Sequence, residues 1–77
     1  MKSITIKLDG IDKVKRFVNL VARFDGDLDL VSDRYIVDAK SIMGIFSLDL
    51  SKPVTLNIRN DAEYDKAAAE LADFMVK

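Results

Sequence analysis

Apolar and polar residues alternate in several short stretches of the chain, which is the pattern of β-strands with one buried face. The first stretch lies at residues 4–8 and the last at residues 54–58. Two more, at 28–31 and 34–39, are separated only by Ser32 and Asp33, and this close spacing predicts a hairpin. The alternation therefore predicts four strands, with these apolar positions: Ile4, Ile6, Leu8, Leu28, Leu30, Val31, Tyr35, Val37, Val54, Leu56 and Ile58.

Two longer stretches have apolar residues at helical spacing. Asp12 is expected to cap the first helix, and Gly26 within segment 25–27 to end it in the left-handed conformation. Asn60 and Glu63 have the spacing of a capping box, which predicts the start of the last helix. The residues expected to be buried are Val14, Phe17, Val18, Val21 and Phe24 in the first helix, and Tyr64, Ala67, Ala68, Leu71, Phe74 and Met75 in the last.

Segment 40–48 is too short for a long helix and too apolar for an ordinary loop. We interpret it as a short helix capped by Ser41. The predicted order is then βαββαβα, an α+β fold of the open-faced β-sandwich type. We expect a four-stranded antiparallel sheet with the helices packed on one face, in a single domain over residues 1–77.

Charge and residue usage narrow the possible functions. The chain has 12 basic and 13 acidic residues, so direct nucleic-acid binding is disfavoured. It has no cysteine and no histidine, which removes disulfides, most ligands of zinc sites and the usual nucleophile–base pairs. We therefore expect no enzyme activity, metal or cofactor. No apolar run has the length of a membrane span, so we expect a cytoplasmic protein that does not bind membranes.

The short helix has more large apolar residues than one buried face accommodates. Ile45 and Leu48 are spaced to face the core, and Ile42, Met43 and Phe46 fall on another side. Exposed residues of these types indicate a protein-docking surface. Two simpler interpretations stand beside this one: Ser41 is only a helix cap, and the apolar residues belong to the core, because a small domain recruits nearly every large side chain.

The run Lys40-Ser41-Ile42-Met43-Gly44, followed by Ile45, Phe46 and Leu48, resembles the regulatory-serine segment of HPr proteins of the bacterial phosphotransferase system. The predicted element order also agrees with the HPr fold, over essentially the whole chain. The resemblance implies that Ser41 is an acceptor for an ATP-dependent serine kinase/phosphorylase. It implies partner contacts for Lys40, Ile42, Met43, Gly44 and Phe46, together with Lys13 and Arg16 of the first helix. The two basic residues also fit a simple solvated helix face.

HPr proteins that carry phosphate do so on a histidine at the start of the first long helix. An ungapped alignment from Ser41 places Gly10 at that position, and no histidine occurs anywhere in the chain. Asp12 is a conceivable substitute as an acyl phosphate, but aspartate at a helix start is far more often a cap. The resemblance is therefore to the histidine-less, catabolite-repression branch of the family.

Two functional hypotheses follow. The first is a regulatory protein of carbon catabolite control, switched at Ser41, whose partners are a serine kinase/phosphorylase and a transcription regulator or metabolic enzyme. The alternative is an HPr-fold interaction module without phosphorylation. In both, the protein acts by protein–protein binding as a monomer or weak dimer.

Overall fold

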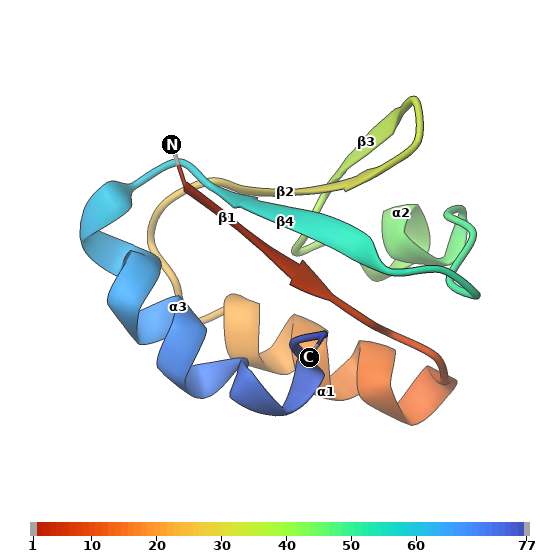
Figure 1. The fold of residues 1–77 in the computed structure, drawn as a ribbon, viewed down its shortest axis with the longest axis horizontal. Helices are drawn as coiled ribbons and strands as arrows, with labels where there is room; N and C mark the ends of the chain where they lie inside the picture. The colour runs from red at the N-terminus through yellow and green to blue at the C-terminus, as the bar shows by residue number, and fades with distance from the viewer. Residues whose placement is uncertain (1, 77) are drawn as a thin grey trace.

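The elements of the computed structural model, which describes residues 2–76, follow the predicted order βαββαβα (Figure 1). The strands are β1 (Lys2–Ile6), β2 (Leu28–Ser32), β3 (Tyr35–Asp38) and β4 (Val54–Ile58). The helices are α1 (Ile11–Val21), α2 (Ile42–Phe46) and α3 (Tyr64–Glu70), and 3₁₀ turns η1 (Asp61–Glu63) and η2 (Ala72–Phe74) flank α3.

The four strands form one antiparallel sheet in the order β1-β4-β2-β3. Within it Leu56 of β4 pairs with Ile4 on one side and with Leu30 on the other. Figure 1 shows α1 and α3 together on one face of the sheet, while the opposite face is open. The main chain after η2 returns to β1, where the Val76 N–H donates to the Thr5 carbonyl. The predicted open-faced α+β fold is confirmed.

The core lies between the sheet and the helices because alternate residues of each strand point toward α1 and α3. Phe17 of α1 and Phe74 of η2 meet edge to face in this layer, with ring centroids 6.1 Å apart and planes at 76°. Burying an aromatic side chain of this kind stabilises the fold by about 1.5–3 kcal/mol. The other buried apolar residues are Ile4, Ile6, Leu8, Val14, Val21, Phe24, Leu28, Leu30, Ala39, Ile45, Leu48, Val54, Leu56, Ile58, Ala67 and Leu71.

Both predicted ends of the first helix are wrong. The N-cap of α1 is Gly10, and Asp12 lies inside the first turn, where its charge still favours the positive end of the helix dipole. The helix ends at Val21, and no described glycine has a positive φ, so Gly26 does not adopt the left-handed conformation. The apolar spacing predicted a longer helix because it continues to Phe24. Phe24 lies in the turn after the helix, and its side chain is buried there.

The predicted capping box at the last helix is half right. The Asn60 side chain accepts a hydrogen bond from the Ala62 N–H, as a cap does. The Glu63 carboxylate instead accepts the N–H groups of Asp25 at 3.1 Å and Gly26 at 2.9 Å. A Cβ atom on Gly26 would lie 2.5 Å from Glu63 Oε1 and 3.0 Å from the Asn60 Cβ, so a larger residue here would displace the Glu63 carboxylate from its two hydrogen bonds.

Smaller differences concern strand ends and burial. The third strand is shorter than residues 34–39, and the turn before it is centred on Asp33, which has a φ of 53°. Tyr64, Ala68 and Met75 of the last helical segment are partly buried, because they lie at the margin of the helix–sheet interface.

Glu63→Gln is expected to lower the free energy of unfolding by about 1–3 kcal/mol, the usual contribution of hydrogen bonds to a charged group. The amide offers one acceptor where the carboxylate offers two, and its NH₂ group faces backbone N–H donors. Urea unfolding followed by circular dichroism measures the change. Asp65→Asn, an exposed carboxylate in the first turn of α3, is the matched control and should change stability by less than about 0.5 kcal/mol. Equal effects of the two variants would contradict the role given to Glu63.

Candidate functional site

Ser41 begins α2 as predicted. Its backbone is extended, with φ −99° and ψ 106°, and its Oγ accepts a hydrogen bond from the Gly44 N–H at 3.1 Å. Its carbonyl accepts the N–H of Ile45, the first hydrogen bond of the helix. The hydroxyl therefore satisfies one of the N–H groups that a helix start leaves unpaired.

The apolar residues of α2 divide between core and surface. Ile45 and, just after the helix, Leu48 are buried, and Ile42 packs partly against the core. Met43 is 79% exposed and Phe46 is 44% exposed, so both contribute apolar area to the outside of the molecule. Of the predicted docking residues, these two form the exposed α2 surface.

Gly44 faces inward. A Cβ atom at this position would lie 3.2 Å from the Cβ of Val37 in β3 and 3.3 Å from Ser41 Oγ. Such distances are shorter than ordinary van der Waals contacts, so a side chain here would push α2 away from β3 or disturb the Ser41 cap. The structure gives Gly44 a packing role beside the site.

Lys40 also turns toward the protein. Its Nζ donates to the carbonyl of Phe24, in the turn that follows α1. Its backbone N–H donates to Asp38 Oδ1 at 2.9 Å. Lys40 therefore connects the start of α2 to the end of α1.

The two basic residues predicted on α1 have acidic neighbours. Lys13 Nζ lies 3.0 Å from Asp9 Oδ1, and both side chains are about half exposed. The Arg16 guanidinium lies over the Phe74 ring, 5.4 Å from its centroid, and 4.0 Å from Asp73 Oδ2. Arg16 is therefore held against η2, with most of its surface open to solvent.

An open apolar hollow of about 340 Å³ lies between the start of α1 and the end of α2. It is lined by Leu8, Asp9, Gly10, Ile11, Phe46, Leu50 and Ser51. Ile11 and Leu50 were not among the predicted site residues, although Ile11 is 62% exposed. The helical spacing from Ile11 to Val14 favours burial, and only the position of the helix start relative to the sheet makes Ile11 exposed.

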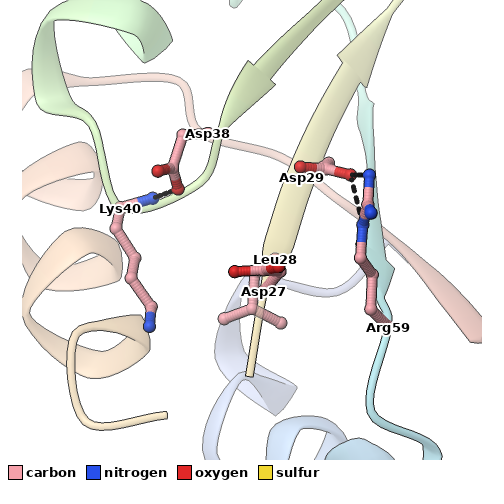
Figure 2. Close-up of a pocket in the computed structure, with 6 residues that line it drawn as sticks. All are labelled: Asp27, Leu28, Asp29, Asp38, Lys40 and Arg59. Atoms are coloured by element: carbon pink, nitrogen blue, oxygen red, sulfur yellow. Dashed lines mark hydrogen bonds and ion pairs between the residues drawn. The ribbon is translucent and has the colours of Figure 1, made fainter. Parts of the chain in front are cut away.

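A second, polar hollow of about 200 Å³ is lined by residues near the ends of β2, β3 and β4: Asp27, Leu28, Asp29, Asp38, Lys40 and Arg59 (Figure 2). In Figure 2 Lys40 and Asp38 stand on one side, and Asp29 and Arg59 on the other. Asp29 Oδ2 accepts Arg59 Nη2 at 2.9 Å, and this bond raises the pKa of Arg59. Asp29 and Arg59 pair with each other, the Lys40 ammonium binds the Phe24 carbonyl, and Asp38 accepts the Lys40 backbone N–H, so most charged groups of this hollow already have partners within the protein.

Two further observations limit the chemistry of the described chain. Among residues 2–76, no group of three or more carboxylate, histidine or cysteine side chains is placed to hold a metal ion. In the same range, no helix has the length and apolar character needed to cross a lipid bilayer.

Ser41→Ala is expected to lower the free energy of unfolding by about 1 kcal/mol, because the Gly44 N–H loses its acceptor. Ser41→Asp should retain most of the stability, since aspartate is an equally good cap. Thermal or urea unfolding compares the variants. Ser3→Ala, at an exposed position of β1, is the control and should cost less than about 0.5 kcal/mol. A loss for Ser41→Asp as large as that for Ser41→Ala would contradict the capping role.

Lys13→Met is expected to raise the pKa of Asp9. The hydrogen bond from Lys13, with its positive charge, now holds this pKa below the ordinary 3.8. A depressed carboxyl pKa stabilises the fold above pH 3.8, and that contribution disappears as the pH falls through the lower, folded-state pKa. Carboxyl ¹³C chemical shifts measured against pH report the change directly. Lys15→Met is the control on the same helix, and an equal shift of Asp9 in both variants would contradict the pairing.

Comparison with known proteins agrees with this geometry. A family model described as the PTS HPr component phosphorylation site matches residues 12–77. The crystal structure of HPr-C-His from Thermoanaerobacter tengcongensis is 32% identical and superposes with a TM-score of 0.76, covering 95% of this chain and 92% of that one.

A second similar structure is that of a phosphocarrier protein HPr from Bacillus anthracis str. Ames. It is 27% identical with a TM-score of 0.72, and the match covers 97% of this chain and 94% of that chain. No curated protein sequence matches significantly. The family model and the structural match over nearly the whole chain lead to one conclusion: this chain belongs to the HPr family of the phosphotransferase system.

Proposed function

We propose that this HPr-family protein is a regulatory interaction module that does not carry phosphohistidine. The observation that carries the proposal is the absence of histidine from the whole sequence. Phosphate transfer through an imidazole needs the imidazole nitrogen as nucleophile. Gly10, which aligns with the histidine position, offers no side chain at all. Relay of phosphate toward sugar uptake is therefore not part of this role.

Ser41 is the proposed switch. Its Oγ is already the acceptor of the Gly44 N–H, and a phosphate ester keeps that oxygen in place. Phosphorylation adds about −2 charge at the start of a helix, where negative charge is favourable. Met43 and Phe46 lie within the same short helix and are exposed. The modification would thus change the charge beside an apolar surface while the local fold persists.

We propose that the protein acts by binding partner proteins through the surface around α2. Met43 and Phe46 provide the centre of the contact, and Ile42, Lys13 and Arg16 provide its surroundings. Lys40 and Gly44 contribute by holding α2 in position, since the Lys40 ammonium binds the Phe24 carbonyl and Gly44 packs on Val37. The expected partners are a serine kinase/phosphorylase and a transcription regulator or metabolic enzyme, all in the cytoplasm. The protein itself acts without enzyme activity.

The test begins with phosphorylation. A purified HPr serine kinase with ATP is expected to add one phosphoryl group to the chain, as measured by mass spectrometry. Ser41→Ala should abolish the addition, and Ser47→Ala, an exposed serine at the other end of α2, should leave it unchanged. Because Ser41→Ala also removes the cap, its folding is verified by circular dichroism. A chain that takes up no phosphate would remove the switch from the proposal.

The phosphorylated and unmodified samples then serve as bait for partner proteins. Phe46→Asp is expected to weaken binding at least about tenfold, because it places a charge in the apolar contact. Tyr35→Asp is the matched control, since Tyr35 is 68% exposed on β3, outside α2. Binding that depends on Phe46 but not on the state of Ser41 would favour the alternative, a constitutive interaction module.

A further inference from the structure

The two edges of the sheet are covered to different extents. At the β1 edge, the main chain after η2 lies alongside the strand, and the Lys7 N–H donates to the Phe74 carbonyl at 2.9 Å. In the same segment, the Val76 N–H donates to the Thr5 carbonyl at 3.0 Å. At the other edge, β3 pairs only with β2 among the residues that the structure describes. An edge strand without a neighbour is a template for pairing with another chain.

The main-chain groups of β3 that remain free follow from its ladder with β2. The Ala39 N–H donates to the Leu28 carbonyl, so these two residues form a hydrogen-bonded pair. Hydrogen-bonded and non-hydrogen-bonded pairs alternate along an antiparallel ladder, and the register places Val37 opposite Leu30, two positions further on. Val37 is therefore bonded to β2, whereas the N–H and C=O groups of Ile36 point away from the sheet. These groups are available to a further strand.

The side chains of β3 also favour pairing. The strand contains neither lysine nor proline, which protect many edge strands from association. Ile36 is 67% exposed, and half-buried Val31 lies opposite it on β2. These two apolar side chains lie on the open face of the sheet, next to its edge. Tyr35, on the other face, is also exposed and would gain apolar contact from a neighbouring strand.

The charges around β3 indicate which strand fits. Arg34 lies two positions before Ile36, and Asp38 lies two positions after it. Antiparallel pairing with a second copy, Ile36 opposite Ile36, therefore places Arg34 of each copy opposite Asp38 of the other. Opposite charges on paired strands stabilise the pairing, and like charges oppose it. The strand is thus complementary to itself in this register.

Neither charged residue has an ion-pair partner in the described part of the chain. The Arg34 side chain is exposed and makes no salt bridge there. The Asp38 carboxylate accepts the Lys40 backbone N–H. The residue opposite Asp38 on β2 is Asp29, a like charge whose own ion pair is with Arg59. A second copy would give both residues the oppositely charged neighbour that a single chain lacks.

We propose that the β3 edge binds a second copy of this chain, strand against strand in antiparallel orientation, with Ile36 opposite Ile36 and Arg34 opposite Asp38. Each copy contributes one short strand, so the contact is small and the dimer forms only at high protein concentration. The proposal goes beyond the proposed function, because it requires neither phosphorylation of Ser41 nor a partner protein at Phe46.

Sedimentation equilibrium, run from about 10 μM to about 1 mM protein, tests for the dimer. The parent chain is expected to show a reversible monomer–dimer equilibrium with a dissociation constant of about 0.1–1 mM. In the ¹⁵N-labelled chain, the amide shifts of Ile36 and Asp38 should change with concentration, and that of Thr5 at the covered edge should not. A chain that remains monomeric over this range, or a dimer whose shifts lie at β1, would overturn the proposal.

Two charge-reversal variants test the register. Arg34→Asp would place carboxylates opposite Asp38, and Asp38→Lys would place cations opposite Arg34, so each variant alone should associate at least about tenfold more weakly than the parent. An equimolar mixture of the two should form a heterodimer, because the new carboxylate of one variant lies opposite the new ammonium of the other. Single variants that dimerise like the parent, or a mixture that stays monomeric, would contradict the proposal.

Arg23→Asp is the matched control, with the same change of charge at an exposed position of the turn after α1, and should associate like the parent. Asp38→Lys also loses the acceptor of the Lys40 N–H, so its folding is verified by circular dichroism. Where it folds poorly, Ile36→Lys replaces it and should lose the dimer, because two ammonium groups would meet at the centre of the interface. Association of the folded Ile36→Lys variant at the strength of the parent would equally overturn the proposal.

Discussion

Strand β4 holds the fold together, because it is paired on both edges with strands from distant parts of the sequence. Leu56 lies opposite Ile4 of β1 and Leu30 of β2, and all three side chains point into the core. A shift of one residue in either pairing would turn a row of buried side chains toward solvent. The register of β4 therefore sets which face of the sheet α1 and α3 cover, and the other elements take their positions from that face.

The position of α2 depends on this sheet through β3. A helix of five residues is not stable alone, so its conformation comes from its attachments. Val37 packs against Gly44, the Ser41 N–H donates to the Asp38 carbonyl, and the Lys40 ammonium reaches Phe24 after α1. Ser41 is consequently the cap of an anchored helix, and a charge added there would act on a surface whose shape is already determined.

Features that depend on local periodicity could be predicted from the sequence. The four strands and the Ser41 cap follow from alternation and from residue preferences over a few positions. Features that depend on long-range contacts could not be found in this way. Glu63 has the spacing of a capping box, yet its partners are Asp25 and Gly26, which only the tertiary fold brings near. Ile11 has the spacing of a buried residue, yet it lies at the start of α1, where the helix is no longer covered.

The site residues show the same distinction. Gly44 and Lys40 belong to the segment that resembles the regulatory-serine region, and from the sequence both were expected to contact partners. The structure separates those that face outward from those that hold the helix. Gly10, by contrast, has an extended backbone and uncrowded surroundings. Neither the backbone nor the packing restricts the side chain at that position. A family member can therefore lack histidine there without strain in the helix that follows.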